Sequence, residues 1–272
     1  MRHAWLIIAH NEFTVLQKLV SMLDDARSDF YIHYDKKVPQ IPEIKAQQGR
    51  LFVLPERIDV RWGTVSQIKT ELLLLATAQK NGPYAHYHII SGTHLPLKPV
   101  SELFKFYDSH AGEEIMRFWN DDAGDADFKL RRYHFPIRNI KSFGKSFVKS
   151  LDNIIWRANL GIQKALGIRH FKKTNFYKTD NWKSLTEKAS RYLVGNAGAI
   201  LKKYRWSLCG DEYYGATEIL SSGESFKVHD CKNLLYADFQ GDTPRKLSME
   251  EYPYLRNSDY LWARKFTSQS TI

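Results

Sequence analysis

Apolar and polar residues follow one another along the first 118 positions in a pattern that predicts strands and helices in alternation. Short apolar runs, typical of buried strands, occupy residues 4–10, 29–35, 51–55, 85–91 and 114–118. Apolar side chains at helical spacing occupy residues 14–25, 64–79 and 100–110. This order predicts a Rossmann-like α/β fold with a mostly parallel sheet, whose ligand lies outside the carboxyl ends of its strands. His10, Asp35 and Gly92 stand at such ends, so we expect them to share one site.

The second half of the chain has a less regular pattern. Helical spacing predicts helices over residues 150–167 and 210–220, and Ser184 with Glu187 has the spacing of a capping box before another helix. Residues 120–130 are expected to form an acidic loop. Because no internal repeat or linker interrupts the chain, we expect residues 1–272 to form a single domain that carries a basic insertion at about 129–175.

The formal net charge of +10 is concentrated in the middle of the chain. Residues 129–183 contain fourteen Lys and Arg but only two acids, Asp152 and Asp180. Such a block favours a polyanion, which could be nucleic acid, an anionic membrane or a phosphorylated substrate. A solvated basic surface explains the same composition, and no nucleic-acid-binding motif accompanies it.

Other features of the sequence restrict the class of protein. No apolar run reaches the length of a membrane span, and the N-terminal residues do not have the pattern of a signal peptide. The cysteines, Cys209 and Cys231, do not have the spacing of a disulfide framework or a metal site, which favours reduced thiols in a cytoplasmic protein. Phosphate-loop, dinucleotide-binding and serine-hydrolase motifs are missing from the sequence.

Two acidic pairs are candidates for chemistry. Asp211 and Glu212 begin a predicted helix, where one carboxylate could act as a general base, although an ordinary acidic helix start is the favoured interpretation of this stretch alone. Asp125 and Asp127 have the Asp-x-Asp spacing that suits Mg²⁺ or Mn²⁺, but a solvated acidic turn is the simpler interpretation.

Cations near the end of the chain are candidates for binding phosphate. Arg245 and Lys246 lie in one basic pair, and Arg264 and Lys265 lie in another, between Trp262 and Phe266. Cations enclosed by aromatic rings lose water and can hold phosphate strongly, whereas cations on an ordinary surface extend over apolar neighbours into solvent.

Seven ordered segments of the chain resemble glycosyltransferase family fourteen, the core-2/I-branching β-1,6-N-acetylglucosaminyltransferases and the related xylosyltransferases. They are "LIIAHNEFTVLQKLV", "FYIHYDKK", "RWGTVSQIKTELLLLATA", "YHIISGTHLPLKP", "NWKSLTEKASRYLV", "CGDEYYGATEIL" and "SDYLWARKF". The resemblance implies a GT-A-type fold and inverting transfer of a sugar, by default N-acetylglucosamine, from a UDP-sugar to an acceptor hydroxyl of a glycan in a surface polysaccharide or glycoconjugate. It also implies that basic side chains replace the usual metal ion, so no cofactor is expected.

The resemblance implies roles for particular residues. Glu212 matches the catalytic base, and Lys265 matches a residue that holds the donor diphosphate. Arg245 matches a second diphosphate-binding residue, for which the adjacent Lys246 could substitute. His10 and Asp35 fall where the family contacts the nucleotide. The acceptor side is expected to include Gly92, His94, Trp182 and Asp211.

The sequence departs from the family pattern at some points. His94 stands in "SGTHLP" where the family usually has Asp, which leaves the acceptor or the bend of that turn open. Without the disulfides and membrane anchor of animal members, the chain is similar to a bacterial cytoplasmic relative. We hypothesise that the basic region places it on the inner face of the membrane, beside a lipid-linked acceptor. Two alternatives remain, a metal-dependent transferase that uses Asp125 and Asp127, and a non-enzymatic polyanion-binding module that uses residues 129–183.

Overall fold

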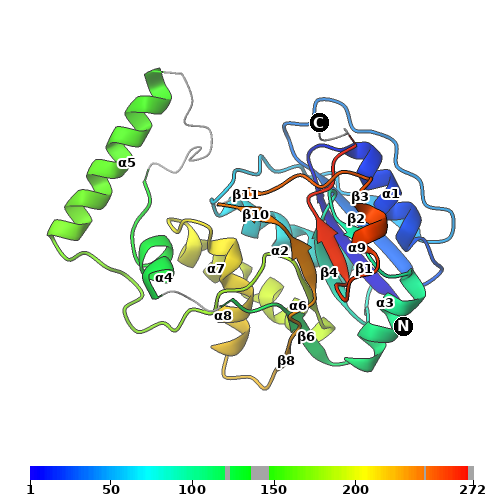
Figure 1. Ribbon diagram of the computed structural model, residues 1–272. Coiled ribbons are helices and arrows are strands. Elements are labelled where there is room, and N and C mark those ends of the chain that lie inside the picture. The colour runs from blue at the N-terminus through cyan, green and yellow to red at the C-terminus, as the bar shows by residue number, and fades with distance from the viewer. Residues whose placement is uncertain (120–122, 136–146, 242, 269–272) are drawn as a thin grey trace.

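A seven-stranded sheet forms the centre of the computed structural model, which describes residues 1–119, 123–135, 147–241 and 243–268 (Figure 1). Its strands lie in the order β3-β2-β1-β4-β7-β6-β8. Their bounds are β1 His3–Ala9, β2 Ser28–Tyr34, β3 Arg50–Val53, β4 Tyr87–Ser91, β6 Glu113–Met116, β7 Lys183–Leu185 and β8 Lys227–Asp230. Strand β7 is antiparallel to both of its neighbours, and the other pairs are parallel. The predicted α/β fold with a mostly parallel sheet is therefore confirmed.

The first half of the chain follows the predicted alternation of strands and helices. Helices α1 (Phe13–Leu23), α2 (Ser66–Gln79) and α3 (Val100–Ser109) join successive strands. Strands β1, β2 and β4 are buried at every position, as expected for central strands covered on both faces. Helix α1 buries Val15, Leu16, Leu19, Val20 and Leu23, a stripe that recurs at helical spacing.

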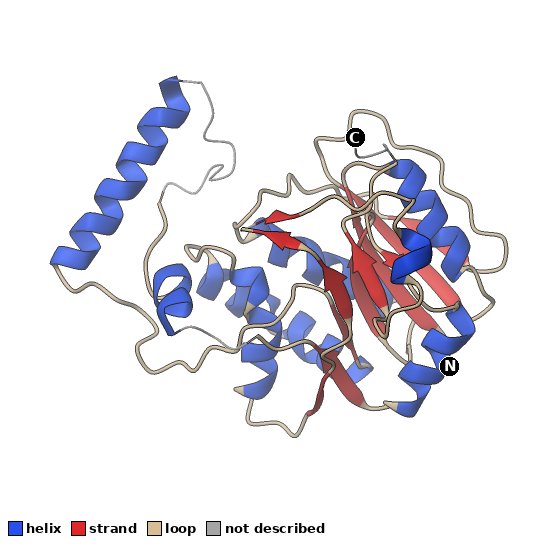
Figure 2. Cartoon of the chain, viewed as in Figure 1, coloured by secondary structure: helices blue, strands red, loops and turns tan. Residues whose placement is uncertain are grey.

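Further helices and two small sheets complete the described structure (Figure 2). The helices are α4 Ala123–Leu130, α5 Phe147–Ala165, α6 Glu187–Gly195, α7 Ala197–Tyr204, α8 Tyr214–Leu220 and α9 Tyr252–Leu255. A three-stranded sheet contains β5 (Leu95–Pro96), β12 (Trp262–Arg264) and β9 (Leu235–Ala237), and a small ribbon pairs β10 (Phe239–Gln240) with β11 (Thr243–Pro244). Helix α5 confirms the helix predicted over 150–167, and it extends away from the rest of the molecule (Figure 1).

Three local predictions differ from the structure. Thr186, not Ser184, caps helix α6, because Ser184 belongs to strand β7 and its hydroxyl lies 2.8 Å from His88 Nδ1. Residues 123–130, predicted as a loop, form helix α4, while residues 120–122 lie outside the described chain. The helix predicted over 210–220 is divided, with a 3-10 turn, η2 (Gly210–Glu212), before helix α8.

Strand β12 places the last part of the chain in the middle of the three-stranded sheet. It is antiparallel to β5 and parallel to β9. The Phe266 amide donates to the Thr93 carbonyl at 3.0 Å, and the Leu247 amide donates to the Lys265 carbonyl at 2.8 Å. As a result, the cation pair predicted near the end of the sequence lies beside the turn that follows β4.

Candidate active site

The carboxyl ends of β1, β2 and β4 meet at one edge of the sheet, as predicted. The Asp35 amide donates to the Ala9 carbonyl and the Gly92 amide donates to the Ile8 carbonyl, both at 2.9 Å. A Cβ at Gly92 would lie 3.3 Å from the Cβ of Ala9, so this position favours a residue without a side chain. His10, Asp35 and Gly92 therefore share one edge of the sheet.

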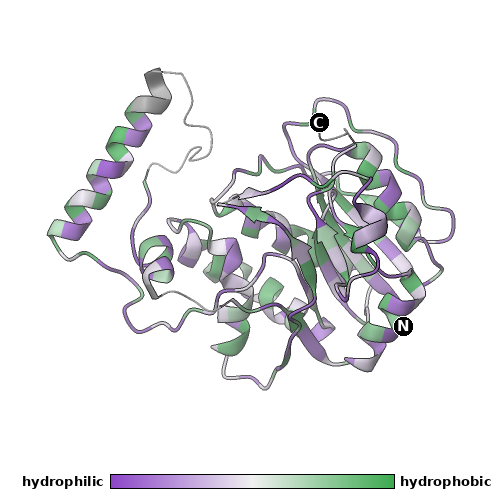
Figure 3. Cartoon of the chain, viewed as in Figure 1, coloured by the Kyte–Doolittle hydropathy of each residue, from purple (hydrophilic) through white to green (hydrophobic). Residues whose placement is uncertain are grey.

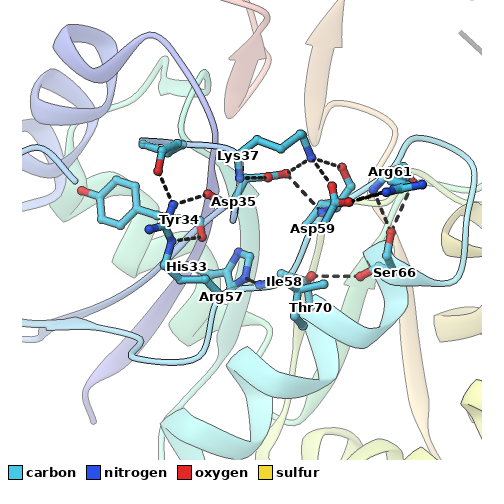
Figure 4. Close-up of polar contacts among 12 residues, drawn as sticks. His33, Tyr34, Asp35, Lys37, Arg57, Ile58, Asp59, Arg61, Ser66 and Thr70 are labelled. Carbon is cyan, nitrogen blue, oxygen red and sulfur yellow. Dashed lines mark hydrogen bonds and ion pairs between the residues drawn. The ribbon is translucent and has the colours of Figure 1, made fainter. Parts of the chain in front are cut away.

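Asp35 is buried and already has cationic and amide partners (Figure 4). Its Oδ1 accepts from the Lys37 amide at 2.8 Å, and its Oδ2 accepts from Lys37 Nζ at 2.8 Å and from the Val60 amide at 3.2 Å. Lys37 also contacts Asp59 Oδ1 at 2.7 Å. The second lysine after Asp35 thus neutralises two carboxylates and fixes the loop that follows β2.

His10 and Lys265 lie within electrostatic range of each other. His10 is exposed at the end of β1, and partial desolvation by its neighbours, followed by the Lys265 charge, lowers its pKa, while the Asp35 carboxylate opposes this shift. A lowered pKa keeps the imidazole neutral near pH 7, where it can donate or accept one hydrogen bond at each nitrogen. The end of β1 and the end of β12 therefore contribute side chains to the same site.

The two basic pairs near the end of the chain have different surroundings. The guanidinium of Arg264 lies 4.8 Å from the centre of the Trp182 ring, and burial lowers its pKa to about 10 against the opposing charge of Asp180. Arg245 is instead held at the surface by two carboxylates, Asp238 at 2.8 Å and Glu251 at 2.7 Å. Arg245 would have to leave these partners to bind a diphosphate, whereas Arg264 is enclosed beside Lys265.

Glu212 lies at the end of the 3-10 turn η2, where its carboxylate is half-buried. Its Oε2 lies 2.9 Å from Lys129 Nζ, which is also 3.2 Å from Asp125 Oδ2. Lys178 Nζ contacts the same Asp125 oxygen at 2.5 Å. Burial lowers the pKa of Lys129, but the nearby carboxylates, Glu212 first, more than offset this effect and raise the pKa overall. The ammonium therefore keeps its charge. Glu212 is thus held by a cation on helix α4.

Asp211 occupies a different environment from its neighbour. It is buried, and its Oδ2 accepts a hydrogen bond from Asn181 Nδ2. Its Oδ1 has no hydrogen-bond partner among the described residues. Burial raises the pKa of Asp211 to about 7, and the charges of Glu212 and Glu71 act in the same direction. The pair therefore divides into a half-exposed carboxylate and a buried carboxyl group.

His94 fixes the turn after β4. Its Nδ1 lies 2.8 Å from Ser91 Oγ and accepts from the Ser91 amide at 3.1 Å. Burial and the Arg264 charge hold the pKa of His94 well below its ordinary value, so the ring is neutral. Its ring packs edge-on against Trp182, with centroids 4.7 Å apart. The residue that replaces the family Asp is thus a buried part of the bend, in contact with another residue predicted for the acceptor side.

Residues 179–182 connect the acidic and basic parts of the site. The Thr179 amide donates to the Glu212 carbonyl at 2.8 Å, and Asn181 donates to Asp211. At the other end of the same segment, Trp182 contacts His94 and Arg264. The structure therefore brings the predicted residues together in one continuous region, with Arg245 at its border.

Sequence reasoning did not assign a role to Lys129. This lysine lies at the start of the basic region, and its contact with Glu212 joins residues 83 positions apart. The local spacing of residues does not predict such a contact, so only the tertiary structure shows that this lysine lies beside Glu212.

Asp125 and Asp127 do not converge. Both lie on helix α4, where a separation of two residues points side chains to different sides. Asp125 contacts Lys129 and Lys178, whereas Asp127 contacts Arg169 at 2.7 Å. This arrangement argues against the two aspartates as joint ligands of one metal ion.

One group of potential metal ligands occurs among the described residues, at the opposite end of the sheet. His110, Glu113 and His229 offer ligand atoms within 4.8 Å of one another. Glu113 begins strand β6, which runs in the same direction as β4, so this group lies away from the edge that holds Gly92.

Comparisons with known proteins place the chain in a family. The model of the Core-2/I-Branching enzyme family matches residues 3–246. Comparison with curated protein sequences gives no significant match. Among solved structures, mouse xyloside xylosyltransferase 1 has 10% sequence identity and a TM-score of 0.41, with 96% of each chain covered. TarS residues 1–349 from S. aureus has 12% identity and a TM-score of 0.29, with 74% of this chain and 66% of that chain covered.

The family match covers most of the chain, including every candidate residue from His10 to Arg245. None of the helices in the described part of the chain is long and apolar enough to cross a bilayer. The chain belongs to the Core-2/I-Branching enzyme family and is therefore a glycosyltransferase.

Proposed function

We propose that the chain transfers a sugar, by default N-acetylglucosamine, from a UDP-sugar to a hydroxyl of a glycan acceptor, with inversion at the anomeric carbon and without a metal ion. The observation that carries this proposal is the half-exposed Glu212 carboxylate, connected through residues 179–182 to the enclosed cations at Arg264 and Lys265. A base and a phosphate-binding group are the two functions that such a reaction requires.

The proposed reaction is a single displacement. The acceptor oxygen bonds to C1 of the sugar while the bond from C1 to the UDP oxygen breaks, and Glu212 takes the proton of the hydroxyl. Negative charge grows on the departing diphosphate, where Lys265 and Arg264 stabilise it as fixed cations. Attack from the face opposite the leaving group inverts C1, through an oxocarbenium-like state of the kind known from glycosidases.

His10 and Asp35 are proposed to contact the nucleotide at the ends of β1 and β2. Arg245 joins the diphosphate site only if it exchanges its contacts with Asp238 and Glu251 for phosphate oxygens. On the acceptor side we propose the Gly92 turn, held by His94, together with Trp182 and Asp211.

Turnover and donor binding of Glu212→Gln test the proposal. A general base typically contributes about 10²–10⁴-fold, so kcat should fall by that order while calorimetry shows unchanged UDP-sugar affinity. Glu218→Gln is a matched control, because Glu218 also forms an ion pair with a lysine, Lys203 at 2.6 Å, but lies away from the proposed site. If Glu212→Gln turned over about as fast as Glu218→Gln, Glu212 could not be the general base.

A further inference from the structure

Helix α5 alternates hydrophobic and hydrophilic residues along its ribbon (Figure 3), and several of its apolar side chains are exposed to solvent. Leu151, Ile154, Ile155 and Ile162 are 47%, 63%, 42% and 57% exposed, and their spacing places them on one side of the helix. Leu166, directly after the helix, is 70% exposed. Helix α1 shows the opposite behaviour, because its apolar stripe is buried against the protein.

Hydrogen bonds on the other side of α5 fix this orientation. Gln163 is buried, with its Nε2 donating to the Tyr133 carbonyl at 2.7 Å and its Oε1 accepting from the Tyr133 amide at 2.8 Å. Asn159 also donates to the Tyr133 carbonyl, and Trp156 Nε1 donates to His134 Nδ1 at 3.1 Å. The helix is thus attached by polar groups and directs its apolar stripe away from the protein, so the stripe requires an external partner.

Four cations line a pocket beside the carboxyl end of α5. The lining residues are Arg131, Arg132, Gly167, Arg169 and Lys172. The acid paired with them in the described structure is Asp127, at 2.7 Å from Arg169 and 3.7 Å from Arg132. One carboxylate against four cations leaves an excess of positive charge, which suits phosphate groups.

We propose that α5 lies in the surface of a membrane containing anionic lipids, with its apolar stripe among the acyl chains and the four-cation pocket on lipid phosphates. An exposed apolar stripe flanked by Lys and Arg is the pattern of an interfacial helix. A second copy with its α5 parallel would bring two basic pockets of the same charge near each other, whereas anionic lipids would neutralise the pocket. This association goes beyond the proposed function, since it is independent of the donor and of the reaction.

The position of the pocket has a consequence for the acceptor. Arg131 and Arg132 follow Lys129, the lysine that contacts Glu212, within the same segment. A lipid phosphate in the pocket therefore lies on a segment that also holds the candidate base. Resting on the proposed function, this arrangement favours an acceptor presented at the membrane surface, as a lipid-linked glycan would be.

Flotation with vesicles tests the proposal. The full chain should float with vesicles containing phosphatidylglycerol and much less with vesicles of phosphatidylcholine alone, and added salt should weaken the association. The double variant Ile154→Ser/Ile162→Ser should lower partitioning to anionic vesicles by about tenfold or more, because it removes inserted apolar carbons. Lys172→Glu should lower partitioning to anionic vesicles by about tenfold, by reversing one charge of the pocket. Tyr254→Ser, which changes an exposed aromatic on α9, is the matched control and should float like the wild type.

Turnover of the double variant on a soluble acceptor separates this proposal from the proposed function. Ile154 and Ile162 do not belong to the site, so turnover should equal that of the wild type even when flotation is lost. The membrane proposal would be overturned if the wild-type protein did not bind anionic vesicles, or if the double variant floated with them as well as the wild type. So would light scattering that shows a wild-type dimer and a monomeric double variant, because a second copy would then cover the stripe.

Discussion

The buried ion pair between Lys183 and Glu71 offers the sharpest test of how the site is supported. Both side chains are fully buried, and Lys183 Nζ lies 2.9 Å from Glu71 Oε2. The same oxygen accepts from the Tyr214 hydroxyl at 2.7 Å, and Lys183 also donates to the Asn181 carbonyl at 2.7 Å. Because the Asn181 side chain holds Asp211, this pair lies directly behind the turn that presents Glu212.

Removing one charge of this pair should be costly. Glu71→Gln leaves a buried ammonium without a counter-ion, and Lys183→Met leaves a buried carboxylate, so each should lower the free energy of unfolding by about 3–5 kcal/mol. The double variant Glu71→Gln/Lys183→Met has no unpaired charge in that position. It should therefore be less destabilised than the sum of the two single variants, with a coupling energy of about 2 kcal/mol or more.

Denaturant unfolding at pH 7 of the four proteins in this cycle measures these quantities. Single variants that each cost less than about 1 kcal/mol, or a double variant whose cost equals the sum, would refute the reasoning. Replacing the exposed pair of Lys188 and Glu224, at 3.4 Å, provides a control that should change stability by at most about 1 kcal/mol.

Three further predictions follow from other groups. Burial raises the pKa of Glu114 to about 7, against hydrogen bonds from Thr186. A carboxyl whose pKa rises on folding stabilises the protein below its ordinary pKa and loses this contribution as pH rises. The unfolding free energy of the wild type relative to Glu114→Gln should therefore fall by about 2–3 kcal/mol between about pH 4.5 and 7.5, and a constant difference would contradict this. Lys129→Ala should lower kcat by about tenfold without changing UDP-sugar affinity. The control Lys203→Ala should leave kcat and affinity unchanged. An equal loss of kcat in the two variants would indicate a general packing defect. Turnover should persist in EDTA. The variant His229→Ala disrupts the group of potential metal ligands far from the site, so any effect of EDTA on this variant would not come from that group. If EDTA abolished the activity of that variant and Mn²⁺ restored it, the reaction would be metal-dependent.

Local patterns predicted the parts of the fold that depend on local burial. The runs at β1, β2 and β4 are apolar because both faces of these strands are covered, and their carboxyl ends identified His10, Asp35 and Gly92 correctly as neighbours. The division between η2 and α8 was missed, since the helical pattern of apolar residues continues across Tyr213.

Long-range contacts set the limit of prediction for the site. The family resemblance assigned roles to Glu212 and Lys265, which stay predictions. Lys129 and Asn181 could not be found, because their contacts with Glu212 and Asp211 join distant parts of the chain. The surroundings of Arg245 were equally hidden, since Asp238 and Glu251 are ordinary surface acids in the sequence. The direction of the α5 stripe depended on hydrogen bonds from Gln163 and Asn159.

Strand β12 also matters for the order in which the protein is made. His10 is synthesised well before Lys265, its electrostatic neighbour, because the two residues lie far apart along the chain. A nascent chain therefore contains every strand of the central sheet, which ends with β8 at Asp230, before β12 is made. Under the proposed function, a chain interrupted between these two strands would lack Lys265 and should not bind the donor diphosphate.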